Sequence, residues 1–255
     1  MEIHHEQIPE ISRYLQQHKI TPEDQERRFA YYRRLMERFI TVGPDTTVLE
    51  IGTGTGWLPI MFKRKGIRCR GLEISPQLIE NARKLGAECG IDPEIDLGNI
   101  EDTDIGESRY DMIIASSVFE HVQFWEEGIA RVYRALRPGG MFVFSSTNKF
   151  SFLSGEYNFP LYGWLPDKWR YRLRIARQGP AVMKLGIDFN QFRYGQLRKA
   201  FRRAGFTEVM DVFEYHNPAE ASSPLKKIVL HAARFKPLKL LFTTFYFSTE
   251  FVCIK

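Results

Sequence analysis

The stretch that decides the fold is Val48-Leu49-Glu50-Ile51-Gly52-Thr53-Gly54-Thr55-Gly56. The apolar, β-branched run 47–51 is typical of a buried strand, and residues 57–65 are expected to form a helix. Between them, the glycines allow a sharp turn and a close approach of the backbone to a ligand. A strand, a glycine-rich turn and a helix make the first half of a nucleotide-binding βαβ unit.

The spacing of the glycines separates two classes of ligand. Dinucleotide-binding proteins carry Gly-x-Gly-x-x-Gly, with the pyrophosphate at the helix N-terminus. Counted from Gly52, the third glycine of that pattern falls on Trp57, so the spacing fails. The acidic Glu50 ahead of the glycines suits a cationic amino group and opposes a pyrophosphate. The stretch resembles motif I of the class I S-adenosylmethionine-dependent methyltransferases, and the resemblance implies that the cofactor is bound by Glu50, Gly52, Thr53, Gly54 and Gly56.

Composition places the chain among globular proteins. Its 255 residues are 44% hydrophobic and 14% aromatic, enough for one α/β domain with or without a cap. It has no apolar run of 18 residues, and its polar N-terminus does not look like a signal peptide. Three widely spaced cysteines give no metal or disulfide framework, so we expect a cytoplasmic protein in a reducing environment.

Charge is shared unevenly between two halves of the chain. Residues 1–139 carry 18 Lys and Arg against 23 Asp and Glu, whereas residues 140–255 carry 18 against 8. The basic half either faces an anionic partner or is simply a solvated surface, and the sequence leaves both readings open.

The first 40 residues are expected to form a helical cap ahead of the main domain, 41–255. Thr21 and Pro22 have the positions of an N-cap and a first helical residue, and the helix that they begin is expected to reach Ile40. In methyltransferases of this type such helices lie over the cofactor and acceptor, so Tyr31 or Tyr32 can line the site; core packing is the alternative.

Two further segments carry cofactor-binding candidates. Glu73 ends a predicted strand, 21 residues after Gly52, where an acidic side chain accepts both ribose hydroxyls in nucleotide-binding α/β folds. The resemblance implies that Ile74 contacts adenine. Gly98-Asn99-Ile100 resembles a Gly-Asp-Ala/Ile stretch of the family. Asn99 replaces the acid there, but its carbonyl oxygen can still accept a hydrogen bond from the adenine amino group, and Ile100 would pack on the ring.

The catalytic candidates follow the predicted strand 110–116, whose last residue, Ser116, joins the implied cofactor-binding set. The segment 117–122 resembles the [Ser/Cys]-x-x-x-Glu-His-Val turn of small-molecule methyltransferases, including ubiquinone-biosynthesis O-methyltransferases. His121 is the predicted general base because its ordinary pKa lies near neutrality, and Glu120 is predicted to orient it or to hold the acceptor. A purely structural role for both residues stays open. Some relatives bind a metal through a Glu at the position of Ser117, so no metal is predicted.

The resemblance implies a Rossmann-like α/β fold with a seven-stranded, mostly parallel sheet whose last strand is antiparallel. The motifs that carry it span residues 45–147, and later strands are expected at 208–215 and 249–254. Acceptor-binding inserts are expected at about 148–190 and 216–247.

The inserts bear on the substrate. The first is rich in aromatic residues and resembles the acceptor-covering insert of methyltransferases that act on glycans, lipids or natural products. In it Arg170, Arg172 and Arg174 alternate, so they would form one face of a strand or, on a helix, spread around its surface. In the second, the basic amphipathic segment 224–247, with Leu225, Ile228 and Phe235 on one helical face, can lie on an anionic membrane, pack on the sheet or meet a second copy.

The expected function is transfer of a methyl group from S-adenosylmethionine, with S-adenosylhomocysteine as product, to an oxygen of a small-molecule, glycan or lipid-linked acceptor. A nucleic-acid or protein methyltransferase and a non-catalytic cofactor-binding subunit are the alternatives. No [Asn/Asp]-Pro-Pro-Tyr follows the strand 110–116, which argues against nucleic acid as a partner. His216 and Asp188 are weaker candidates for the base, and no oligomeric state is predicted.

Overall fold

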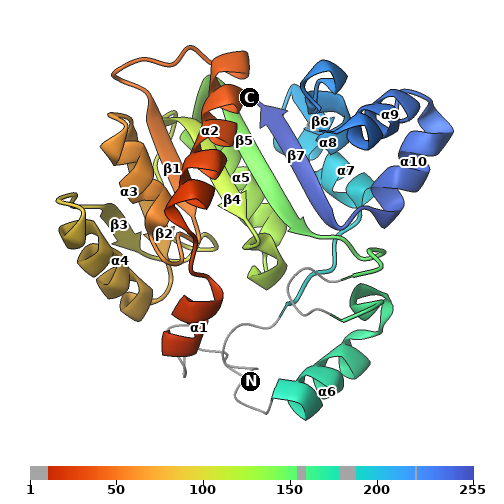
Figure 1. Ribbon diagram of the computed structural model, residues 1–255, viewed down its shortest axis with the longest axis horizontal. Helices are drawn as coiled ribbons and strands as arrows, with labels where there is room; N and C mark the ends of the chain where they lie inside the picture. Colours follow the sequence, from red (N-terminus) through yellow and green to blue (C-terminus); the bar gives the residue numbers. More distant parts are fainter. Residues whose placement is uncertain (1–10, 154–158, 179–187, 222) are drawn as a thin grey trace.

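The computed structural model describes residues 11–153, 159–178, 188–221 and 223–255 (Figure 1). The first ten residues of the predicted cap and two parts of the predicted first insert, 154–158 and 179–187, lie outside the described residues. The described residues form one seven-stranded sheet in the order β3-β2-β1-β4-β5-β7-β6. The strands are β1 (Thr47–Ile51), β2 (Arg68–Glu73), β3 (Glu94–Leu97), β4 (Tyr110–Ser116), β5 (Leu136–Thr147), β6 (Glu208–Asp211) and β7 (Ser248–Ile254).

Strand directions confirm the predicted sheet. The pairs β1–β2, β1–β4, β2–β3 and β4–β5 are parallel. The last strand, β7, runs antiparallel to both β5 and β6. The strand order turns back at β1, which lies between β2 and β4. In open α/β sheets ligands bind outside the carboxyl ends of the strands at such a switch point, so the end of β1 is where a site is expected.

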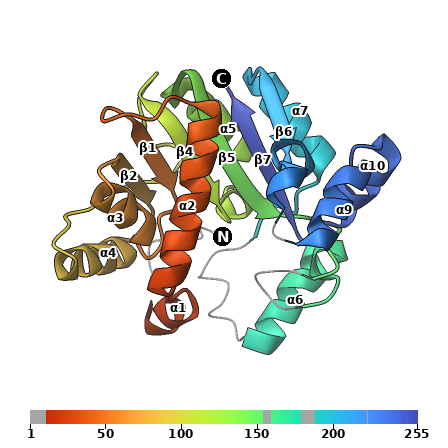
Figure 2. The same cartoon turned by 45° about the horizontal axis from the view of Figure 1, so that its top comes forward.

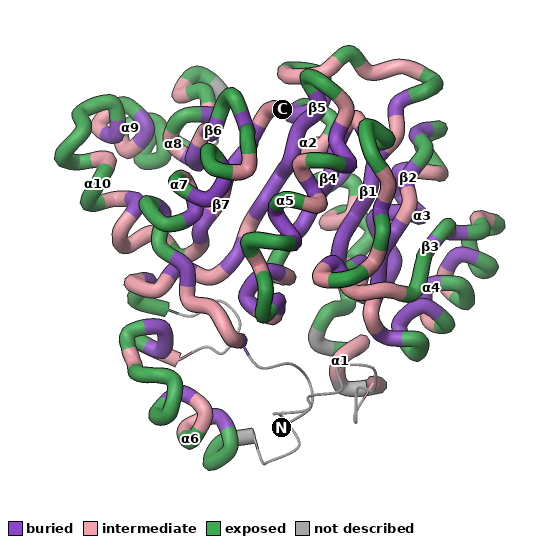
Figure 3. The backbone as a smooth tube through the Cα atoms, turned by 180° about the vertical axis from the view of Figure 1, so that it is seen from behind, coloured by how far each residue is buried: buried purple, intermediate pink, exposed green. Residues whose placement is uncertain are grey.

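Helices cover both faces of the sheet (Figures 1 and 3). One face carries α2 (Pro22–Phe39), α3 (Trp57–Arg64) and α4 (Pro76–Glu88), and the other carries α5 (Trp125–Ala135) and α7 (Tyr194–Ala204). Near the carboxyl edge of the parallel strands lie α1 (Ile11–Gln17) and α6 (Asp167–Gln178). Beyond β6 the chain forms α8 (Val212–Tyr215), α9 (Pro224–Ala232) and α10 (Lys236–Phe245), which lie on one side of the molecule (Figure 2). Short 3-10 turns span Phe119–His121, Tyr162–Trp164 and Pro218–Glu220.

The predicted start of the long N-terminal helix is confirmed. The Thr21 side chain accepts a hydrogen bond from the Asp24 backbone N–H at 3.2 Å, and Pro22 follows at the first helical position. The helix packs on α3 through Phe29, whose ring meets Phe62 edge-on at 5.2 Å. Burial of this apolar face, more than intrinsic propensity, stabilises the helix on the sheet.

One local prediction was wrong, and the structure decides another that the sequence left open between a strand and a helix. The strand expected over 208–215 ends at Asp211, because Asp211 accepts a hydrogen bond from Phe213 N–H and Glu214 accepts one from Asp211 N–H, which closes a capping box and begins α8. The three alternating arginines do not form a strand face either. They lie on α6, where Arg170 and Arg174 are buried and Arg172 is exposed, as residues four apart share one side of a helix and a residue between them does not.

None of the helices in the described ranges is both long enough and apolar enough to cross a bilayer.

Candidate active site

The glycine turn after β1 is held from two sides. Gly52, Gly54 and Gly56 have φ of 68°, 58° and 78°, in the left-handed region that favours glycine. A Cβ on Gly52 would lie 2.3 Å from the Val118 side chain, which belongs to the turn after β4. A Cβ on Gly56 would lie 2.2 Å from the Ala82 Cβ of α4. Glycine is therefore required at positions 52 and 56, because a side chain there would collide with Val118 or with Ala82.

Glu73, at the end of β2, ties the glycine turn to the neighbouring strand. One carboxylate oxygen accepts a hydrogen bond from Gly54 N–H at 2.8 Å, and the other accepts from Ile74 N–H at 2.9 Å and Ser75 N–H at 3.0 Å. Burial raises the pKa of Glu73, while the three backbone donors lower it. The side chain thus holds the turn in place, and it lies where the sequence predicts the ribose contact.

Glu50, the last residue but one of β1, is a buried carboxylate with one described polar partner, the Thr53 hydroxyl, which donates to it at 3.1 Å. Burial, and secondarily the charge of Glu73, raises the pKa of Glu50 well above its ordinary value. In the part of the chain that the structure describes, no ion pair joins Glu50 to a cation. Because a buried carboxylate is costly unless it is paired, this position fits the ammonium group of a ligand.

The third segment of the predicted cofactor site, after β3, is held by a local hydrogen bond. Asn99 follows β3, and its side-chain oxygen accepts a hydrogen bond from Glu101 N–H at 3.1 Å, which fixes the amide. An amide oxygen has two lone pairs, so it can accept a second donor. Ile74 is half-buried, whereas Ile100 is buried in the main hydrophobic core. The contacts of these three residues with adenine stay predictions.

The turn after β4 carries the two catalytic candidates in different surroundings. Glu120 is buried and accepts a hydrogen bond from the Ser146 hydroxyl of β5 at 2.6 Å. His121, the next residue, is half-buried. The Asn190 amide donates to the carbonyls of Phe119 at 3.1 Å and of Val122 at 2.7 Å, which brackets this turn. Glu120 therefore anchors the turn to β5, while His121 lies nearer to solvent.

Ser116, at the end of β4, lies in a polar row across the carboxyl edge. Its hydroxyl is 2.9 Å from that of Ser145, which it faces in the parallel register of β4 and β5. Ser145 in turn faces Glu250 in the antiparallel register of β5 and β7. This row of polar side chains runs along the carboxyl edge from β4 through β5 to β7.

Glu250 was missed by sequence reasoning. It accepts hydrogen bonds from the Tyr215 hydroxyl at 3.0 Å and the Ser248 hydroxyl at 2.7 Å. The Tyr31 hydroxyl lies 3.2 Å from that of Tyr215, and burial raises the pKa of Tyr31 to about 12. Tyr31 thus reaches this edge of the sheet, as the resemblance implies for a residue of the N-terminal helices. The available signal was that Glu250 is the only acidic residue after Glu220.

Asp188 is unsuited to act as a base. It is fully buried, and it pairs with Arg170 at 2.5 Å and with Arg174 at 2.9 Å. It also accepts hydrogen bonds from the Gln191 amide at 2.9 Å and the Tyr162 hydroxyl at 3.3 Å. Asp188 therefore fixes α6 to the chain that leads into α7.

The described residues contain no group of three or more His, Cys, Asp or Glu side chains placed to hold a metal ion.

A profile of the methyltransferase domain family matches residues 25–210. The chain belongs to this family of methyltransferases. The match confirms the predicted S-adenosylmethionine-dependent class, and the buried Glu50, the glycine turn and Glu73 stay the predicted contacts of its cofactor.

Curated relatives of this methyltransferase agree with that class. It is 30% identical over 135 residues to a ubiquinone biosynthesis O-methyltransferase from Methylobacterium sp. (strain 4-46), covering 49% of this chain and 53% of the relative. It is 29% identical over 120 residues to a malonyl-[acyl-carrier protein] O-methyltransferase from Serratia marcescens, covering 46% of each. The chain thus spans about half the length of these two relatives. A longer match, 29% over 217 residues, covers 75% of this methyltransferase and 82% of a ubiquinone biosynthesis O-methyltransferase from Methylocella silvestris.

Solved structures share the fold. Phosphoethanolamine N-methyltransferase 2 from Haemonchus contortus, in complex with S-adenosyl-L-methionine, superposes with a TM-score of 0.60 at 14% identity, covering 96% of this chain and 56% of that one. An S-adenosylmethionine-dependent methyltransferase from Mesorhizobium loti gives 0.55 at 17% identity, covering 89% and 98%. At these identities the likeness establishes the fold alone.

Proposed function

We propose that this methyltransferase methylates a hydroxyl oxygen of a small-molecule, glycan or lipid-linked acceptor. The observation that carries the proposal is the turn Phe119–His121, which brings a half-buried histidine to the end of β4, where ligands of such sheets bind. The names of the curated O-methyltransferases support oxygen as the acceptor atom.

The cofactor is held by residues of the first half of the chain. S-adenosylmethionine supplies an electrophilic methyl group on a sulfonium. Glu50 pairs with its ammonium group, since a buried carboxylate gains most from a cation in the same dry environment. Glu73 accepts a hydrogen bond from a ribose hydroxyl with the one lone pair that its three backbone donors leave unused.

The acceptor must lose a proton as its oxygen attacks. His121 takes that proton, because imidazole is the side chain whose ordinary pKa suits a base at neutral pH. Glu120 holds the turn that carries His121 through its bond with Ser146, and so acts as a positioning residue. In-line attack requires the acceptor oxygen within about 3–3.5 Å of the methyl carbon.

The place of action that we propose is the cytoplasm. The structure leaves Cys69, Cys89 and Cys253 as free thiols, and Cys69 and Cys253 are buried. Free thiols are usual in a reducing compartment.

The test is transfer of labelled methyl from S-adenosylmethionine by the purified chain into a cell extract, which is then divided into lipid, small-molecule, nucleic-acid and protein fractions. We expect label in the lipid or small-molecule fraction, as a methyl ether. Label in nucleic acid or protein would contradict the proposal, and so would a methylamine product. If no fraction is labelled although the cofactor binds, the result points to an acceptor that the extract lacks or to a non-catalytic subunit.

The base is tested separately with His121→Gln. We expect kcat to fall by about 100-fold or more and the neutral limb of the pH profile to disappear, with cofactor affinity unchanged. His216→Gln is the matched control, because it makes the same replacement at a second histidine. The centroid of the His216 ring lies 6.3 Å from that of Tyr31 and 4.7 Å from that of Tyr215. A rate that is unchanged across pH in His121→Gln removes this residue from the mechanism.

A further inference from the structure

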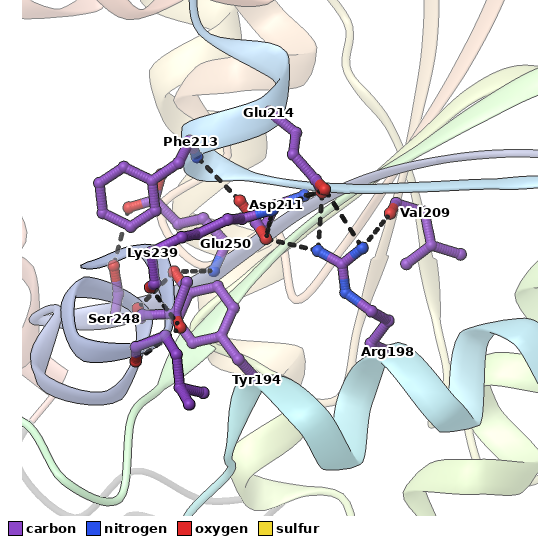
Figure 4. A network of polar contacts seen from close by, with 11 residues as sticks. Tyr194, Arg198, Val209, Asp211, Phe213, Glu214, Lys239, Ser248 and Glu250 are labelled. Carbon is purple, nitrogen blue, oxygen red and sulfur yellow. Dashed lines mark hydrogen bonds and ion pairs between the residues drawn. The ribbon is translucent and has the colours of Figure 1, made fainter. Parts of the chain in front are cut away.

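Helix α10 has a half-buried lysine and exposed leucines, which is unusual for a helix on the surface of a domain. One of its two lysines, Lys239, is only 22% exposed and pairs with Asp211 at 2.8 Å and Glu214 at 2.6 Å (Figure 4). Its leucines Leu240 and Leu241 are 70% and 50% exposed. A helix on a soluble domain normally turns its apolar side to the core and its charges to water, whereas α10 turns Lys239 inward and leaves Leu240 and Leu241 at the surface.

Polar contacts hold α10 in this orientation. Arg198 of α7 also pairs with Asp211 and with Glu214, so the two carboxylates bind α7 and α10 together (Figure 4). Although burial raises the pKa of Glu214, its hydrogen bonds from Arg198 and Lys239 lower it to about 2, so Glu214 stays charged at neutral pH. The leucines cannot turn inward without breaking these pairs.

The neighbouring helix extends the exposed apolar surface. On α9 the residues Leu225 and Ile228, and Phe235 just after it, are each more than half exposed. The sequence placed these three on one helical face, but the face that packs inward is that of Leu230 and Ala233. Helices α9 and α10 lie side by side on the same flank of the molecule (Figures 1 and 2).

Aromatic side chains continue this surface toward the carboxyl edge of the sheet. The ring of Phe245, at the end of α10, stacks on Phe152 at 5.0 Å and on Trp164 at 6.1 Å. Phe152 and Trp164, which both belong to the predicted acceptor insert, remain 55% and 40% exposed. Exposed aromatic rings of this kind are enriched where proteins meet the boundary between lipid and water.

The charge of the segment identifies what covers this surface. Residues 223–247 contain five Lys and Arg and no Asp or Glu, and exposed cations flank the leucines at Lys226, Lys227, Arg234 and Lys236. A second copy of the chain in a two-fold contact would set these cations against themselves. An anionic bilayer supplies both an apolar layer and the opposite charge.

We propose that α9, α10 and the rings of Phe152 and Trp164 form a docking face for the surface of an anionic phospholipid membrane. The leucines and rings enter the boundary between headgroups and acyl chains, and the lysines pair with lipid phosphates. The face adjoins the insert beside the carboxyl edge, so docking brings the acceptor side of the enzyme next to the bilayer. The proposal does not depend on the identity of the acceptor or on the role of His121.

Co-sedimentation of the full chain with vesicles tests the docking face. We expect binding to phosphatidylcholine vesicles that contain phosphatidylserine, weakened by salt, and little binding to phosphatidylcholine alone. Leu240→Ala with Leu241→Ala should weaken binding about ten-fold or more without changing charge. Replacing Lys226, Lys227 and Lys236 by alanine should weaken it about five-fold for each lysine removed.

A charge-matched control separates the face from a general effect of charge. Leu240→Glu with Leu241→Glu lowers the net charge by two and should abolish binding. Arg83→Glu, on the exposed side of α4, lowers it by the same amount and should bind nearly as the parent does. Retained binding of S-adenosylhomocysteine shows that each variant is folded. The proposal is overturned if the parent chain does not bind anionic vesicles at low salt. It is also overturned if light scattering shows a dimer that the leucine variants convert to monomers.

Discussion

Two buried carboxylates at the carboxyl edge of this molecule have opposite surroundings. Asp188, in the second half, is paired with two guanidinium groups. Glu50, in the first half, accepts a hydrogen bond from the Thr53 hydroxyl, and burial raises the pKa of Glu50 well above the ordinary value. A carboxylate that the protein neutralises itself serves the fold, whereas one that it leaves without a cation is suited to a cationic ligand. The comparison assigns Asp188 to stability and Glu50 to the cofactor.

The largest effect that sharpens this comparison is expected at Asp188. Asp188→Asn leaves the guanidinium groups of Arg170 and Arg174 buried without their counter-ion, and should lower the free energy of unfolding by about 3–5 kcal/mol. Urea denaturation measures this. Asp167→Asn is the control, because Asp167 pairs with the same Arg170 but is 68% exposed, so its loss should cost less than about 1 kcal/mol. Equal losses for the two variants would mean that burial of the pair is irrelevant.

Substitution of Glu50 should change the free energy of unfolding in the opposite direction. Glu50→Gln keeps an acceptor for the Thr53 hydroxyl and removes a buried charge, so the ligand-free protein should gain about 1–3 kcal/mol in free energy of unfolding at neutral pH. Glu94→Gln is the control, since Glu94 is exposed and pairs with Lys63 at the surface, and it should change stability little. A loss of stability in Glu50→Gln would show that the fold itself needs the charge.

The pH dependence of stability follows from the raised pKa of Glu50. Below the ordinary glutamate pKa, near about 4.3, the side chain is protonated in both the folded and unfolded states, and its contribution to stability is fully present. As pH rises toward the raised pKa, the unfolded state ionises first, so stability is lost. The difference in melting temperature between Glu50→Gln and the parent should therefore grow with pH. Thermal scans between pH 5 and pH 8 check this, and a constant difference would contradict it.

The smallest expected effect is at Thr53. Thr53→Val keeps the volume of this buried side chain but removes its hydrogen bond to Glu50. The loss of about 1 kcal/mol should weaken cofactor affinity about five-fold. Titration calorimetry measures the change. In the Glu50→Gln background, Thr53→Val should weaken cofactor affinity less. An equal loss of affinity in both backgrounds would mean that Thr53 does not act through Glu50.

The sequence predicts the first half of the molecule better than the second. The glycine turn, the acidic end of β2 and the Thr21 cap depend on local rules, in which a few adjacent residues determine the backbone. The inward direction of Lys239 depends instead on Asp211 and Glu214, which lie more than 20 residues earlier in the chain. The same holds for Asp188, which meets Arg170 and Arg174 across the first insert, and for Glu250 beside Tyr215. Contacts between distant segments are not visible in the spacing of residues.

The most direct test of the assignment of Glu50 compares two ligands. S-adenosylhomocysteine carries an amino acid group, and 5′-methylthioadenosine has the same nucleoside without it. Calorimetric titration of both into the parent and into Glu50→Gln isolates the contact between the carboxylate and the ammonium. We predict that the parent strongly prefers S-adenosylhomocysteine and that Glu50→Gln loses about ten-fold or more of this preference. An unchanged preference would contradict the account, because Glu50 would then not be the partner of the cofactor's ammonium group.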